Sequence, residues 1–113
     1  MSVELQTNQG DNGVATVLVQ GDIDMSSSNQ VRTYLLDLFQ NNQKAVVVDL
    51  SGVSYIDSSG IATLVEGLQW SHAKKTKFRL TGMTPTVRDV FEIARLLTVF
   101  EVFESNEEAL KGV

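Results

Sequence analysis

Two kinds of hydrophobic spacing alternate along this chain of 113 residues. Near the N-terminus, apolar side chains alternate with polar ones from Val3 to Leu5 and again from Val14 to Val19. The run Gly10-Asp11-Asn12-Gly13, rich in turn-forming residues, separates the two stretches. Alternation on both sides of a turn is typical of a β-hairpin. We therefore expect the chain to begin with two antiparallel strands.

After Asp24 the apolar spacing changes to steps of three and four, which is the period of an amphipathic helix. The serines at 26–28 offer N-caps for this helix, and Asn41-Asn42 is a suitable end. The side chains expected on its buried face are Val31, Tyr34, Leu35 and Leu38.

The next stretch, Ala45 to Val48, is continuously apolar and mostly β-branched. Such a run is typical of a strand that is covered on both faces and has parallel neighbours. Beyond Gly60 the helical period returns and predicts a second helix that ends near Lys74-Lys75. Its expected apolar face is Ile61, Leu64, Val65 and Leu68. Asp57, Ser58 and Ser59 are thereby placed at the start of this helix.

The remaining elements are shorter. A strand is expected over Phe78 to Leu80, and Thr84-Pro85 opens a third helix, because Pro is tolerated at the first helical position. The buried face of that helix is predicted to be Val87, Val90, Phe91 and Ala94. Val99 to Phe103 should form a last strand, and Ser105 followed by Glu108 has the spacing of a capping box.

Taken together, the pattern predicts a single α/β domain over residues 1–113. An N-terminal β-hairpin would lead into a mixed, largely parallel sheet with about four helices.

Composition narrows the possible functions. The net charge of -5 disfavours nucleic acid and anionic membranes as partners, and the chain has no cysteine for a disulfide or a thiolate metal site. No basic and then apolar segment resembles a signal peptide, and no apolar run approaches the ~20 residues of a membrane span. We expect a cytoplasmic protein without a metal or cofactor.

Ser58 is the candidate for chemistry, because unpaired N–H groups and the helix dipole favour an anion at a helix start. A phosphate on Ser58 would be stabilised at this position. The alternative is that Asp57 or Ser58 acts only as an N-cap, with its side-chain oxygen accepting an N–H of the first turn.

A Ser-His-Asp hydrolase does not fit the sequence. The only histidine, His72, follows Ser58 by 14 residues in the same predicted helix. At ~1.5 Å per residue the two side chains are on the order of 20 Å apart, which is too far for a hydrogen bond. We therefore do not expect an enzyme.

Other polar and aromatic positions have two interpretations each. Asp22, Asp24 and Asp57 would form an acidic rim around Ser58 if the two strands before them end at the same edge; alternatively, Asp24 only helps to start its own helix. Trp70 is predicted to point away from the apolar face of its helix. It is then either an anchor for a partner or a side chain that packs on a neighbouring loop.

Three segments carry a family resemblance. The run from Val46 to Ile61, VVVDLSGVSYIDSSGI, resembles the core of a STAS domain. Gly21 to Asp24 is similar to the acidic turn before that family's first helix, and Met83 to Phe91 is similar to the start of its third helix. The resemblance covers almost the whole chain and is specific to stand-alone bacterial anti-sigma factor antagonists, or anti-anti-sigma factors.

The resemblance implies a STAS-like fold and a partner-switching role in transcription regulation. In that family, the serine after the aspartate is phosphorylated by an anti-sigma factor that is also a serine kinase with a histidine-kinase-like ATPase fold. The unphosphorylated form binds this kinase and frees a sigma factor, and a PP2C-type phosphatase restores it. The matching residue here is Ser58.

The expected partner-binding residues are Asp24, Asp57, Ser58, Ser59, Gly60 and Trp70. Ser59 is assigned a supporting role in the turn, although only mapping of the phosphate separates it from Ser58. Gly60 is expected to let another chain approach the backbone closely.

Two further functions remain open at this point. The chain can be a constitutive STAS subunit of a larger complex, such as a lipid-transport ABC system or a stress-sensing assembly. It can also be an unregulated binding module in which Ser58 is a cap. Fold alone does not separate these functions.

Overall fold

The structure is a computed structural model that describes residues 3–10 and 12–113; Asp11 of the predicted turn lies outside them. The elements in chain order are β1 (Glu4–Gln9), β2 (Val14–Gln20), α1 (Ser28–Gln40), β3 (Ala45–Gly52), α2 (Ser58–Lys74), β4 (Lys77–Thr81), α3 (Pro85–Ile93), β5 (Glu101–Phe103) and α4 (Asn106–Ala109).

The strands form one five-stranded sheet in the order β1-β2-β3-β4-β5, with β3 in the centre. β1 pairs with β2 in the antiparallel sense, and every later pair is parallel. The predicted hairpin and the predicted largely parallel sheet are therefore both confirmed. Because β2, β3 and β4 run in the same direction, the loops that follow them emerge at one edge of the sheet.

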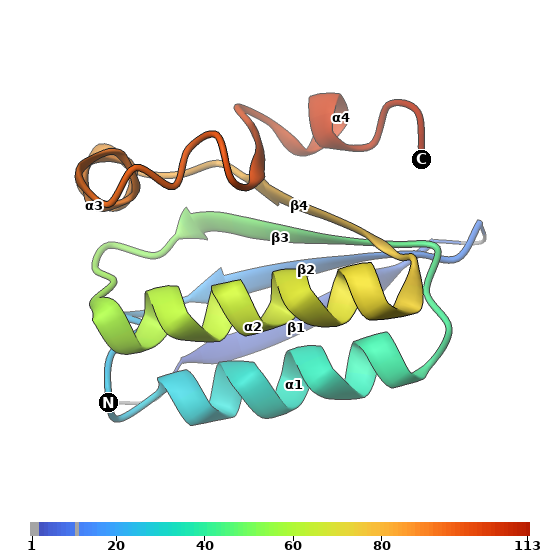
Figure 1. The fold of residues 1–113 in the computed structure, drawn as a ribbon, viewed down its shortest axis with the longest axis horizontal. Coiled ribbons are helices and arrows are strands. Elements are labelled where there is room, and N and C mark those ends of the chain that lie inside the picture. The colour runs from blue at the N-terminus through green and yellow to red at the C-terminus, as the bar shows by residue number, and fades with distance from the viewer. Residues whose placement is uncertain (1–2, 11) are drawn as a thin grey trace.

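The two faces of the sheet are covered unequally (Figure 1). Helices α1 and α2 lie side by side on one face, where Val46, Val48 and Leu50 of β3 enter the main core. The alternate side chains Ala45 and Val47 point to the other face and belong to a smaller cluster with Ala109 of α4. β3 is thus buried on both sides, as its continuous apolar run predicts.

Helix starts largely follow the sequence signals. Pro85 occupies the first turn of α3 after the N-cap Thr84, whose hydroxyl donates to the Val53 carbonyl at 2.9 Å. Ser105 caps α4 by accepting a hydrogen bond from the Glu108 N–H at 3.2 Å. These contacts confirm the predicted starts of both helices.

The segment between α3 and β5 differs from the prediction. α3 ends at Ile93, and Ala94 is exposed instead of lying on the buried face. The predicted last strand begins only at Glu101, and Val99 is exposed. The intervening residues form hydrogen-bonded turns that bury Phe100 against Phe91, with ring centroids 5.6 Å apart. Burial of Phe100 against Phe91 is thus favoured over a longer β5 that would begin at Val99.

Candidate functional site

The loops after β2 and β3 meet at the edge from which both emerge. Ile23 and Ile56 form a parallel β-bridge beyond the regular strands. The Ile23 N–H donates to the Tyr55 carbonyl at 2.9 Å, and the Asp57 N–H donates to the Ile23 carbonyl at 3.1 Å. This bridge brings Asp24 and Asp57 to the same edge, which is the condition that the sequence set for an acidic rim.

Asp57 is the N-cap of α2. One carboxylate oxygen, Oδ1, accepts hydrogen bonds from the Ser59 N–H at 2.9 Å and the Gly60 N–H at 3.3 Å. The same oxygen also accepts the Ser59 hydroxyl at 2.5 Å. The Ser59 hydroxyl and then the two N–H groups lower the pKa of Asp57, against partial burial and the nearby Asp24 charge, which raise it. The cap is therefore an anion at neutral pH.

Ser58 and Ser59 have different surroundings. Ser58 is the first residue of α2 and its side chain is exposed. Ser59 is half-buried, and its hydroxyl donates to Asp57. The helix start therefore presents Ser58 to solvent and holds Ser59 in the cap.

Asp24 matches both of its sequence interpretations. Its Oδ1 accepts hydrogen bonds from the Ser26 N–H at 2.9 Å and the Ser26 hydroxyl at 2.6 Å, and its carbonyl accepts the Ser27 and Ser28 N–H groups. The Ser26 side-chain and backbone bonds are the main causes that lower the pKa of Asp24. Asp24 thus organises the start of α1, and its charge also acts on Asp57.

Asp22 lies on the same edge, where its Oδ1 accepts the Ser54 hydroxyl at 2.9 Å. Asp22, Asp24 and Asp57 thus share one edge, in agreement with the first of the two sequence interpretations, and a serine hydroxyl donates to each carboxylate. In contrast to the expected cap, Ser27 makes no side-chain cap bond to α1; its buried hydroxyl donates to the Asp22 carbonyl at 2.7 Å.

Packing within the chain itself requires a glycine at position 60. It is buried in the first turn of α2, where an added Cβ would lie 2.6 Å from Ile56 Cγ1 and 2.8 Å from Ile23 Cγ2. The absent side chain allows α2 to approach the bridge within its own chain. Close approach of another chain at Gly60 stays a prediction.

The outward orientation predicted for Trp70 is wrong. Its half-buried ring packs against α1, with centroids 6.4 Å from Phe39, and the Arg32 guanidinium carbon lies 5.5 Å from its centroid. Arg32 also pairs with Glu66 at 3.2 Å. This side of α2 faces α1, which explains why Thr63 is buried as well. Contact between Trp70 and a partner stays a prediction.

Sequence reasoning missed two residues at the edge. Met25 is 84% exposed and Tyr55 is 47% exposed. Both lie within two residues of the Ile23–Ile56 bridge, in segments without a helical or strand period. Their apolar character next to a candidate site was the available signal.

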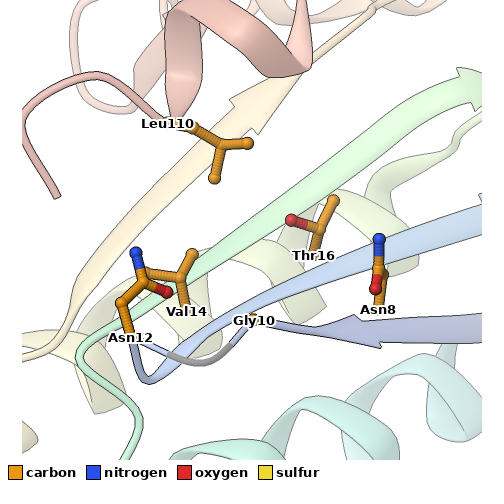
Figure 2. Close-up of a pocket in the computed structure, with 6 residues that line it drawn as sticks. All are labelled: Asn8, Gly10, Asn12, Val14, Thr16 and Leu110. Atoms are coloured by element: carbon orange, nitrogen blue, oxygen red, sulfur yellow. The ribbon is translucent and has the colours of Figure 1, made fainter.

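The remaining candidates are remote from this edge. His72 lies in the last turn of α2, about four turns from Ser58. In the described ranges, no group of three or more histidine and acidic side chains could hold a metal, and no helix is long and apolar enough to span a membrane. The pocket in Figure 2 lies at the β1–β2 turn, at the opposite ends of the strands from Ser58, with Leu110 over it.

This mixed five-stranded sheet with its N-terminal hairpin is also the fold of known proteins. The family model described as the STAS domain matches residues 4–109, and the chain belongs to this family.

Individual relatives cover most of the chain. It is 25% identical over 103 residues to the anti-sigma-B factor antagonist of Listeria monocytogenes, covering 90% of both chains. It is 26% identical over 102 residues to the anti-sigma-F factor antagonist RsfB of Mycobacterium tuberculosis, covering 90% of this chain and 83% of the relative. The crystal structure of an anti-sigma factor antagonist from Mycobacterium paratuberculosis superposes with a TM-score of 0.89 at 25% identity, over 98% and 93% of the two chains. These relatives are regulators by name.

Proposed function

We propose that this protein is an anti-sigma factor antagonist that is inactivated by phosphorylation of Ser58. In the unphosphorylated form it binds an anti-sigma factor with serine kinase activity and a histidine-kinase-like ATPase fold, and the sigma factor is released. The names of the relatives support the antagonist role. The observation that carries the switch is the exposed side chain of Ser58 in the first turn of α2.

The phosphoryl transfer needs little from this chain beyond position. The Ser58 hydroxyl oxygen attacks the γ-phosphorus of ATP, the bond to the ADP oxygen breaks, and the hydroxyl proton passes to a carboxylate of the kinase. Asp57 does not serve as the base, because in phosphoryl transfer that residue belongs to the kinase. Its Oδ1 accepts the Ser59 hydroxyl and two N–H groups. Its role is to hold the backbone of the turn so that Ser58 stays accessible.

The phosphate acts mainly on the partner. It adds about −1.5 to −2 charge at neutral pH. The start of α2 stabilises that charge, whereas Asp57 and Asp24 oppose it, so the fold of this protein changes little. A surface that accepted a hydroxyl must instead bury or oppose a dianion, which is costly. A loss of ~3 kcal/mol in binding corresponds to more than a hundredfold in affinity.

The proposal is tested by incubating the protein with ATP and each purified anti-sigma factor kinase of its own genome. We expect one kinase to add a single phosphate, which peptide mass spectrometry places on Ser58. Ser58→Ala should abolish the modification, and the matched control Ser59→Ala should retain it. Phosphate on Ser59 alone, or no transfer by any kinase, would contradict the proposal.

Restoration of the binding-competent form is assigned to a PP2C-type phosphatase in the cytoplasm. Treatment of the phosphorylated protein with such an enzyme should return its mass and its affinity for the kinase. Stable binding to ABC-transport components, without any phosphate in the cell, would instead favour a constitutive subunit.

A further inference from the structure

Two apolar side chains in the loops of the candidate site are exposed to solvent. Met25 is 84% exposed, which is the largest value among the exposed large hydrophobic residues, and Tyr55 is 47% exposed. Neither belongs to the hydrophobic core or to the side chains packed against it. Exposed apolar side chains that gather at one place on a surface mark interaction sites.

The bridge between the two loops fixes both residues close to the switch. Tyr55 directly precedes Ile56, and Met25 follows Ile23 by two residues, so the two residues lie near the Ile23–Ile56 pairing in the loops after β3 and β2. The carbonyl of Tyr55 accepts the Ile23 N–H, which makes its backbone position rigid. The same pairing positions Asp57 and hence the first turn of α2.

The charged side chains of the two loops have one sign. Residues 21–28 and 53–60 contain Asp22, Asp24 and Asp57 but no lysine, arginine or histidine. Hydrogen bonds from serines lower the pKa of Asp24 and of Asp57, so both carboxylates are ionised at neutral pH. A partner surface complementary to this edge is therefore basic around an apolar centre.

We propose that Met25 and Tyr55 are the apolar anchors of the contact with the anti-sigma factor kinase. The kinase accepts them in an apolar pocket that lysine or arginine side chains surround. This inference rests on the proposed function and adds the residues that supply affinity. The two anchors then supply the binding energy of the contact. Ser58 lies at the margin of this contact, where its phosphorylation changes the affinity.

The probe is the purified kinase that phosphorylates Ser58, and the readout is its dissociation constant by calorimetry. Met25→Ala and Tyr55→Ala should each weaken binding about tenfold or more, as expected for anchors. In phosphorylation assays both variants should raise KM and leave kcat unchanged, because neither side chain touches the reacting hydroxyl. Tyr55→Phe should restore affinity if the ring is the anchor.

Two matched controls separate anchoring from general surface hydrophobicity. Val99 is 52% exposed and precedes β5, and Leu110 is 40% exposed beside the β1–β2 turn (Figure 2), so both lie away from the Ser58 edge. Val99→Ala and Leu110→Ala should stay within twofold of wild type. Urea unfolding midpoints close to wild type for all four alanine variants show that they are folded.

A separate variant tests whether the partner surface is basic. Asp22→Asn keeps an oxygen that can accept the Ser54 hydroxyl but removes the negative charge. We expect it to lower affinity at low salt and to reduce the dependence of affinity on salt.

Unchanged affinity in folded Met25→Ala and Tyr55→Ala would overturn the anchors and leave the switch intact. Failure of every kinase to bind the wild-type protein would overturn the proposed function, and the anchors with it.

Discussion

Asp57 links the two loops of the candidate site to the start of α2. Its folded-state pKa is lowered, above all by the Ser59 hydroxyl, so folding favours its ionised form. The resulting stabilisation is complete above the unfolded pKa of about 3.9 and is lost as the pH falls through the lower, folded value.

The Asp57 carboxylate should make the stability of the protein depend on pH. Between about pH 5 and pH 3, wild-type stability should fall relative to Asp57→Asn, which keeps a capping oxygen without the charge. Ser59→Ala should reduce the effect, because it removes the largest cause of the pKa shift. Urea unfolding at a series of pH values measures this. A constant difference between wild type and Asp57→Asn would contradict the account.

The first turn of α2 has no room for a side chain at Gly60. Gly60→Ala places a methyl group against Ile56 and Ile23 and within 3.0 Å of the Ile23 carbonyl, so we expect a loss of roughly 1–3 kcal/mol in the free energy of unfolding. Gly67→Ala in the same helix is the control. Its methyl group would meet the Phe78 ring at 3.1 Å, where a small shift and the better helix propensity of alanine offset each other. Equal unfolding midpoints for the two variants would refute the steric argument.

At the scale of elements, α1 and α2 are joined by a contact that includes Trp70, Phe39 and Arg32. Trp70→Ala should lower the free energy of unfolding by about 2 kcal/mol, less than for a fully buried tryptophan. Exposed Gln69 is the neighbouring control, and Gln69→Ala should change stability by less than about 0.5 kcal/mol. If Trp70→Ala unfolds like wild type, its packing on α1 does not contribute to stability.

The helices and strands with a regular hydrophobic period were the most predictable part of the fold. Periodicity correctly predicted the hairpin, α1 and the central β3, because each buries side chains at regular intervals. It placed Trp70 wrongly because α2 contacts both the sheet and α1. The second contact uses small residues such as Thr63, which an apolar pattern does not mark.

The candidate site was predictable in part. The position of Asp57 and Ser58 followed from a strand that leads into a helix, and the meeting of Asp24 with Asp57 followed from parallel strands. For Met25 and Tyr55 the sequence offers only their apolar character next to the candidate site, and this does not separate an exposed apolar residue from a core residue without the tertiary structure.

In the whole molecule, the hydrophobic core and the candidate site lie in different parts of the fold. The core of α1, α2 and the sheet holds the edge rigid, while the residues at that edge carry the charge and the exposed serine. We therefore expect phosphorylation to change partner affinity far more than fold stability. Unfolding midpoints of the modified and unmodified protein should be similar.

The most direct measurement is the affinity of the anti-sigma factor kinase for the protein with and without phosphate on Ser58, determined by calorimetry on homogeneous preparations. The account predicts that the phosphate weakens binding more than a hundredfold, which corresponds to ~3 kcal/mol. Equal affinity of the two forms, with the phosphate verified on Ser58, would contradict it.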